Sequence, residues 1–84
     1  MATDRSEFIN AALGIAIRAK RHALGISQEE LAARSNLHRT YVADVERGNR
    51  NPSLESIHAI ANGLGIQISE LFRRIENQHK RRSR

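Results

Sequence analysis

Apolar side chains recur along the chain at the three- and four-residue spacing of amphipathic helices, in five segments separated by glycine and polar residues. The first segment predicts a helix over residues 6–23. Gly25 closes it, because glycine adopts the left-handed conformation without steric cost. The second predicts a short helix that ends near Ser35, and Ser27 and Glu30 have the spacing of a capping box at its start.

The third and fourth helices are predicted by the same signals. After a turn over residues 35–37, a helix is expected from Arg39 to Arg47, with Gly48 as its terminator. A polar loop then leads to Ser53, which is expected to cap the fourth helix. That helix ends at Gly65, and its apolar residues keep helical spacing: Leu54, Ile57, Ile60, Ala61 and Leu64.

A fifth helix is expected to begin at a cap on Ser69. Its apolar residues fall at positions i, i+3, i+4 and i+7: Ile68, Leu71, Phe72 and Ile75. No segment of the sequence has the alternating pattern of a strand. We therefore predict an all-α fold, a single domain of five helices over residues 6–76, followed by a disordered basic tail over residues 77–84.

The composition narrows the class of protein. A chain of 84 residues is too short for two separate cores, so we expect one domain. The absence of cysteine excludes disulfides and thiolate zinc sites. The longest uncharged apolar stretch, residues 8–17, is about half the length that crosses a bilayer. We expect no contact with a membrane and a cytoplasmic location.

The net charge of +5 favours an anionic partner, most often nucleic acid. Residues 1–72 hold eight basic and eight acidic side chains, whereas residues 73–84 hold six basic side chains and one acidic side chain. The excess charge therefore lies in the tail. Two interpretations of the tail remain open: a solvated end that aids solubility, and direct contact with phosphate.

The second and third predicted helices, joined by a tight turn, describe a helix-turn-helix. Residues 26–32 (ISQEELA) resemble the second helix of the phage-repressor, or Xre-type, DNA-binding domains. Residues 45–48 (VERG) resemble the end of their recognition helix, and residues 69–72 (SELF) the start of their fifth helix. Residues 37–42 and 45–51 are similar to the controller proteins of restriction-modification systems, which are small autoregulatory homodimers. The resemblance implies a sequence-specific DNA-binding regulator of transcription.

A recognition helix presents its first turn to base edges in the major groove, so we expect Arg39, Thr40 and the outward-facing Ala43 to read bases. The guanidinium of Arg39 can bond O6 and N7 of one guanine, which contributes about 1–3 kcal/mol of discrimination. In the family the loop after this helix touches sugar-phosphate or base edges, and there Arg50 is the expected reader. Asp44 is not expected to read bases but to orient Arg39 or face solvent.

The phosphate backbone is expected to be contacted from the first three helices and from the loop after the third. Gln28 opens the second helix, where free backbone N–H groups also point toward a phosphate. Tyr41 either reaches the DNA backbone or packs half-buried. The remaining expected phosphate contacts are Lys20, Asn49 and Asn51.

The resemblance also implies a structural pair between Arg21 and Glu46, which would hold the recognition helix on the first helix. His38 departs from the family pattern, because the residue before a helix is more often Ser, Thr or Asp, and we expect a weaker cap there.

Two recognition helices related by a two-fold axis read two half-sites. The residues expected at the homodimer interface are Ile66, Ile68, Phe72 and Ile75; the alternative is that they all belong to the monomer core.

Catalysis is not expected. The four histidines share no metal-ligand spacing, and no glycine-rich phosphate loop occurs. We therefore expect no enzyme activity, no metal, no cofactor and no small-molecule ligand, with double-stranded DNA as the partner. Two alternatives remain: an antitoxin or bridging protein-interaction module with secondary DNA contact, and non-specific DNA packaging driven by the tail.

Overall fold

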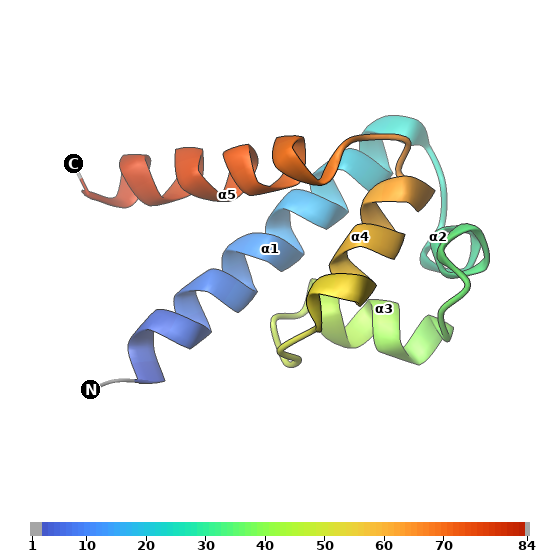
Figure 1. Ribbon diagram of the computed structural model, residues 1–84, viewed down its shortest axis with the longest axis horizontal. Helices are drawn as coiled ribbons and strands as arrows, with labels where there is room; N and C mark the ends of the chain where they lie inside the picture. Colours follow the sequence, from blue (N-terminus) through green and yellow to red (C-terminus); the bar gives the residue numbers. More distant parts are fainter. Residues whose placement is uncertain (1–2, 84) are drawn as a thin grey trace.

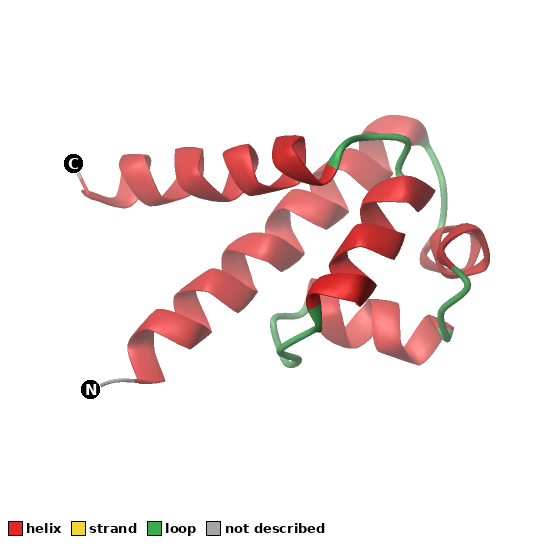
Figure 2. Ribbon diagram, in the orientation of Figure 1, coloured by secondary structure: helices red, strands yellow, loops and turns green. Residues whose placement is uncertain are grey.

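A computed structural model describes residues 3–83, with side chains over residues 7–78. The described chain forms five helices and no strand (Figures 1 and 2): α1 (Thr3–Leu24), α2 (Gln28–Ser35), α3 (Arg39–Glu46), α4 (Leu54–Gly63) and α5 (Ile68–Ser83). The predicted all-α fold with five helices is confirmed. None of the described helices combines the length and the apolar character needed to cross a membrane.

The helices pack around one core. The long α1 runs diagonally upward from the N-terminus, α4 lies in front of its far end, and α5 lies above α1 and diverges from it toward the C-terminus (Figure 1). α2 packs against α3 and α4, α3 packs against α1, and α5 packs against α1 and α4. Every helix contributes buried side chains to the centre, where the largest are Ile17, Leu31, Ile60, Leu64, Leu71, Val42 and Val45. The core thus fixes α2 and α3 as a rigid pair on one side of the molecule.

The predicted caps account for most helix ends. The hydroxyl of Ser27 accepts from the backbone N–H of Glu30 at 3.0 Å, and that of Ser53 accepts from Ser56 at 3.1 Å. Gly25 has a φ of 70°, a left-handed conformation that a side chain would strain. These local signals placed the starts of α2 and α4 and the end of α1 correctly.

One sequence prediction, at the start of α5, is wrong. Ser69 does not cap α5, because the helix begins one residue earlier, at Ile68. The capping residue is Gln67, whose carbonyl accepts from the backbone N–H groups of Glu70 and Leu71. Leu54 keeps helical spacing with the core residues but is 65% exposed. It is the first residue of α4, where the helix has not yet reached its neighbours.

α5 is longer than predicted. Its backbone stays helical to Ser83, past the expected domain end at residue 76 and through a segment expected to be disordered. No glycine or proline interrupts residues 68–84, and Glu, Gln, Lys and Arg are good helix formers. The side chain of Gln78 also donates to the carbonyl of Ala12 at 3.0 Å, which ties this half of α5 to α1. The side chains of residues 79–84 lie outside the described residues.

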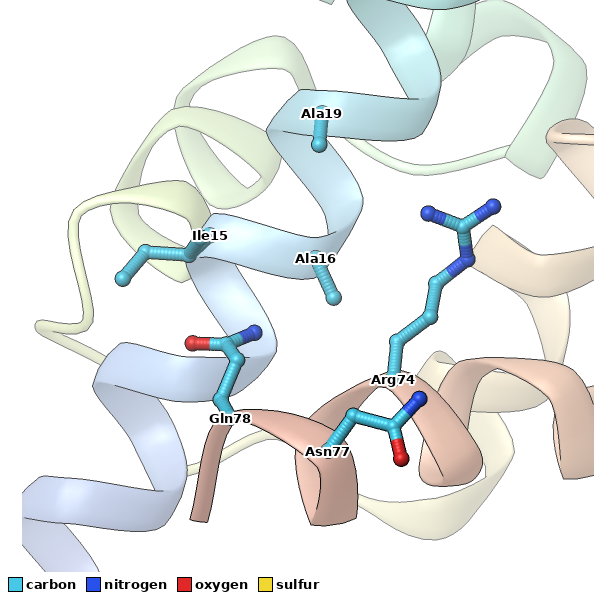
Figure 3. A pocket seen from close by; sticks show the side chains of 6 residues that line it. All are labelled: Ile15, Ala16, Ala19, Arg74, Asn77 and Gln78. Atoms are coloured by element: carbon cyan, nitrogen blue, oxygen red, sulfur yellow. The ribbon is translucent and has the colours of Figure 1, made fainter. Parts of the chain in front are cut away.

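An open surface pocket of about 410 Å³ also lies between α1 and α5 (Figure 3). Its α1 wall is apolar and its α5 wall is polar, and the lining residues are Ile15, Ala16, Ala19, Arg74, Asn77 and Gln78. Arg74 donates to Glu70 at 3.3 Å. α2 and α3 contribute no residue to the pocket, which is therefore separate from the helix-turn-helix.

Candidate nucleic-acid interface

The turn between α2 and α3 is closed by a left-handed residue. Asn36 has a φ of 57° and a ψ of 42°, a conformation that asparagine tolerates better than most residues. The backbone N–H of Leu37 donates to the carbonyl of Ala32 at 2.9 Å, and the Leu37 side chain packs on the core. α3 therefore starts three residues after Asn36, in a fixed direction.

His38 supplies the cap for α3. Its backbone is extended, and its Nδ1 accepts from the backbone N–H of Thr40 at 3.1 Å. An imidazole nitrogen replaces the usual hydroxyl or carboxylate acceptor, and the expectation that this cap is weaker stays a prediction. The first turn of the recognition helix is thereby held in place.

α3 has one buried face and one open face. Val42, Val45 and Glu46 are buried, whereas Arg39 and Thr40 are exposed. The guanidinium of Arg39 makes no hydrogen bond or ion pair within the described residues, so its five N–H donors are available to a ligand. Ala43, also expected to face the groove, is half-buried.

A buried carboxylate holds three helices together. Glu46 of α3 has a fully buried side chain and receives two hydrogen bonds from Arg21 of α1: Nε to Oε2 at 2.6 Å and Nη2 to Oε1 at 2.9 Å. Gln28 of α2 donates its Nε2 to Oε1 at 3.0 Å. Arg21 also donates to the carbonyl of Ile26 in the loop before α2. The expected pair is therefore part of a larger network.

The network sets the charge state of Glu46. Burial raises the pKa of its carboxyl, but the hydrogen bonds from Arg21 and Gln28, with the charges of Arg21 and Arg18, outweigh burial and hold the pKa below its ordinary value. The pKa of Arg21 is raised, first by its hydrogen bond to Glu46. Both groups are therefore ionised at neutral pH.

Gln28 has a contact that the sequence did not reveal. Its amide nitrogen is directed at Glu46, and its expected contact with phosphate stays a prediction. Nothing in the local pattern relates positions 28 and 46, since the contact depends on how α2 crosses α3. The side chain retains its amide oxygen and a second N–H for a further partner.

The loop after α3 is organised by Tyr41 and Asp44. The guanidinium of Arg50 lies over the Tyr41 ring, 4.6 Å from its centroid, and its Nη2 is 3.8 Å from Oδ2 of Asp44. Arg47 donates to the other carboxylate oxygen of Asp44. Asp44 thus pairs with Arg47 and Arg50 and does not orient Arg39, which was one of its two expected roles. Arg47 lies three residues away on the same helix face, whereas Arg39 lies five residues away. Tyr41 is half-buried against the core.

The remaining candidate residues lie at the surface. Lys20 is half-buried and makes no ion pair among the described side chains. Asn49 and Asn51 are exposed, and the backbone N–H of Asn49 donates to the carbonyl of Asp44 at 3.0 Å. The residues expected at the dimer interface lie in α5 and in the loop before it. Three of them pack partly against the core: Ile66, Ile68 and Ile75. The fourth, Phe72, is 39% exposed.

This arrangement defines the class of the protein. The helix-turn-helix family matches residues 17–71, which include α2, α3 and α4 in full, and the chain belongs to that family.

Its relatives include regulators of restriction-modification systems. The chain is 51% identical to control protein C.BamHI of Bacillus amyloliquefaciens over 47 residues, which cover 56% of this chain and 58% of the relative. Among solved structures, the restriction-modification controller protein C.AhdI from Aeromonas hydrophila superposes with a TM-score of 0.72 at 47% identity, over 74% of this chain and 94% of the other.

Another similar solved structure is a complex with DNA. The controller protein C.Esp1396I, crystallised as a tetramer in complex with its natural 35 base-pair operator, superposes with a TM-score of 0.79 at 33% identity. The match covers 83% of this chain and 92% of the other. The resemblance to controller proteins expected from the sequence is confirmed.

Proposed function

We propose that this chain is a sequence-specific DNA-binding regulator of transcription, which acts as a homodimer on a pseudo-palindromic operator and controls its own gene. One observation carries the proposal: Arg39, in the first turn of α3 after the His38 cap, is exposed with no partner among the described residues. Family membership and the operator-bound C.Esp1396I structure support it. Two of the relatives named above come from bacteria, where the DNA lies in the cytoplasm, so we extend the proposal to a cytoplasmic location.

In this proposal α3 lies in the major groove. Arg39 donates to O6 and N7 of a guanine, and Thr40 offers its hydroxyl or methyl group to the next base. Ala43 is small enough to allow close approach of the helix to the base edges. Arg50 reads a base from the loop, and the ring of Tyr41 and the carboxylate of Asp44 restrict the positions that its guanidinium occupies before binding.

Phosphate contacts fix the register of α3 on the duplex. Gln28 lies at the start of α2, where backbone N–H groups and the helix dipole attract an anion. Its bond to Glu46 holds the side chain at that end of the helix. The other proposed phosphate contacts are Lys20, Tyr41, Asn49 and Asn51.

The homodimer would form through α5 and the loop before it. Ile66, Ile68 and Ile75 each keep part of their surface exposed, and Phe72 is exposed over 39% of its surface. Two-fold pairing would place the two α3 helices on half-sites about 34 Å apart or a multiple of that distance. Sedimentation at micromolar concentration, with and without palindromic DNA, tests this pairing; a monomer in both cases would contradict it.

The proposed function is tested by selecting bound fragments from random DNA and comparing Arg39→Ala with the wild type. We expect the wild type to select a two-fold symmetric site, and Arg39→Ala to lose about tenfold or more in affinity for that site. Arg34→Ala is the matched control, because Arg34 lies in the last turn of α2, paired with Glu30 and outside the proposed interface.

No selected sequence, or equal affinity for random DNA, would contradict the proposed function and favour packaging. An Arg39→Ala variant that keeps full regulatory output would instead favour a protein-interaction module.

A further inference from the structure

The last carbonyl of the recognition helix is bonded by a side chain from another helix. At the end of α3 the backbone N–H groups of residues 47, 48 and 49 donate to the carbonyls of residues 43, 45 and 44 respectively. The carbonyl of Glu46 receives no backbone N–H in the described chain. Arg18 of α1 donates its Nη2 to that oxygen at 3.3 Å. A cation at a helix C-terminus also interacts favourably with the helix dipole.

The same face of α1 touches the backbone of α3 directly. A Cβ on Gly14 would lie 2.4 Å from the carbonyl oxygen of Glu46 and 2.7 Å from that of Val45. A Cβ on Gly48 would lie 3.2 Å from the Cα of Ala11. Ala11, Gly14 and Arg18 are spaced three and four apart, so they share one face of α1. We name this face the α1 seat.

The α1 seat determines where α3 ends and where the next loop begins. Residues 49–51, which supply Arg50 in the proposed function, follow directly after the Gly48 turn that rests on Ala11. A shift of the end of α3 on α1 would therefore move both Arg50 and the axis of α3 relative to the bases.

We infer that Arg18 is a positioning residue for DNA readout, which acts through the carbonyl of Glu46 rather than by binding phosphate. This inference rests on the proposed function. The Arg18 side chain is 48% exposed, but its guanidinium is directed inward: Nη2 bonds the Glu46 carbonyl, and Nε lies 3.8 Å from Oε1 of the same residue.

Lys20 offers a matched comparison. It lies on the same helix two residues further on, carries the same charge, and has no hydrogen-bond partner in the described part of the chain. A phosphate contact and a positioning residue differ in two measurable quantities. Loss of a phosphate contact lowers affinity equally for all sequences and reduces the salt slope by about 1, whereas loss of positioning reduces discrimination between bases.

The experiment measures the affinity of full-length Arg18→Ala and Lys20→Ala for the site that the wild type selects and for the same site with its guanine replaced, at several salt concentrations. For Arg18→Ala we expect the ratio of the two affinities to fall about tenfold, which is within the range of discrimination that one base contact contributes. The salt slope should stay unchanged. For Lys20→Ala we expect the slope to fall by about 1 and the ratio to stay constant.

Further variants separate positioning from loss of folding. Circular dichroism at the assay temperature establishes the folded fraction of each variant. Arg18→Lys keeps a cationic donor and is expected to restore most of the discrimination. Gly14→Ala leaves the charge unchanged and is expected to reduce discrimination with no change in slope.

An Arg18→Ala variant that behaves like Lys20→Ala would overturn the inference and leave the proposed function intact. Wild-type discrimination in both Arg18→Ala and Gly14→Ala would overturn it as well. A wild-type chain that binds all sequences equally would contradict the proposed function itself.

Discussion

Replacing Glu46 with glutamine tests the network that joins α1, α2 and α3. The substitution preserves the shape of the side chain and removes its charge. Arg21, whose side chain is only 11% exposed, then loses the carboxylate that accepts two of its hydrogen bonds. Gln28 loses a charged acceptor and faces a second amide.

The size of the effect follows from burial. Removing one partner of a buried ion pair costs about 3–5 kcal/mol, because the other charge remains uncompensated. Glutamine keeps one acceptor oxygen, so we expect the lower end, about 3 kcal/mol. The total free energy of unfolding of a domain of 84 residues is about 4–13 kcal/mol, so the loss is a large fraction of it. The melting temperature should fall by on the order of 15 °C.

The assay is urea and thermal unfolding at pH 7, followed by helical circular dichroism at a fixed protein concentration, since dimerisation would make the midpoint depend on concentration. Glu30→Gln is the matched control. Its i,i+4 pair with Arg34 has a distance of 3.0 Å, but the two side chains are 51% and 45% exposed. We expect that control to change stability by less than about 0.5 kcal/mol. Equal effects of the two substitutions would refute the reasoning from burial.

Three further predictions follow from the same geometry. Folding lowers the pKa of the Glu46 carboxyl from its ordinary value of 4.5, so the ionised carboxylate stabilises the fold above that pH, and this stabilisation is lost as the pH falls through the lower pKa of the folded state. In urea titrations the difference in free energy of unfolding between the wild type and Glu46→Gln should therefore shrink in acid. A difference that stays constant with pH would contradict this. Ser27→Ala should lower stability by about 1 kcal/mol by the same unfolding assay, because the N–H of Glu30 loses its acceptor, and an unchanged midpoint would exclude the cap. Deleting residues 79–84 should lower DNA affinity equally for all sequences and flatten the salt slope, whereas a changed preferred sequence would show that the tail reads bases.

The sequence predicted the helices well where the signal is local. A serine cap and a left-handed glycine involve residues at most four apart, so the ends around Gly25, Ser27 and Ser53 were correct. Ser69 was placed wrongly, because a residue type that favours the capping position also occurs inside the first turn of a helix.

The site was predicted less completely than the fold. The exposure of Arg39 and Thr40 follows from the periodicity of α3, and the pair of Arg21 with Glu46 came from the family resemblance. The bond from Gln28 to Glu46 and the contact of Arg18 with the end of α3 were missed. Each joins residues at least 18 apart, so it depends on how two helices cross rather than on any spacing within one helix.

The separation of α5 from the reading helices has a consequence for how such chains diversify. α5 packs on α1 and α4, whereas the proposed base-reading residues lie on α3 and the loop behind it. Substitutions at exposed positions of the last helix can therefore accumulate without displacing the proposed base-reading residues. Grafting the final helix of a relative onto this chain should change which subunits assemble while its target sequence is inherited unaltered.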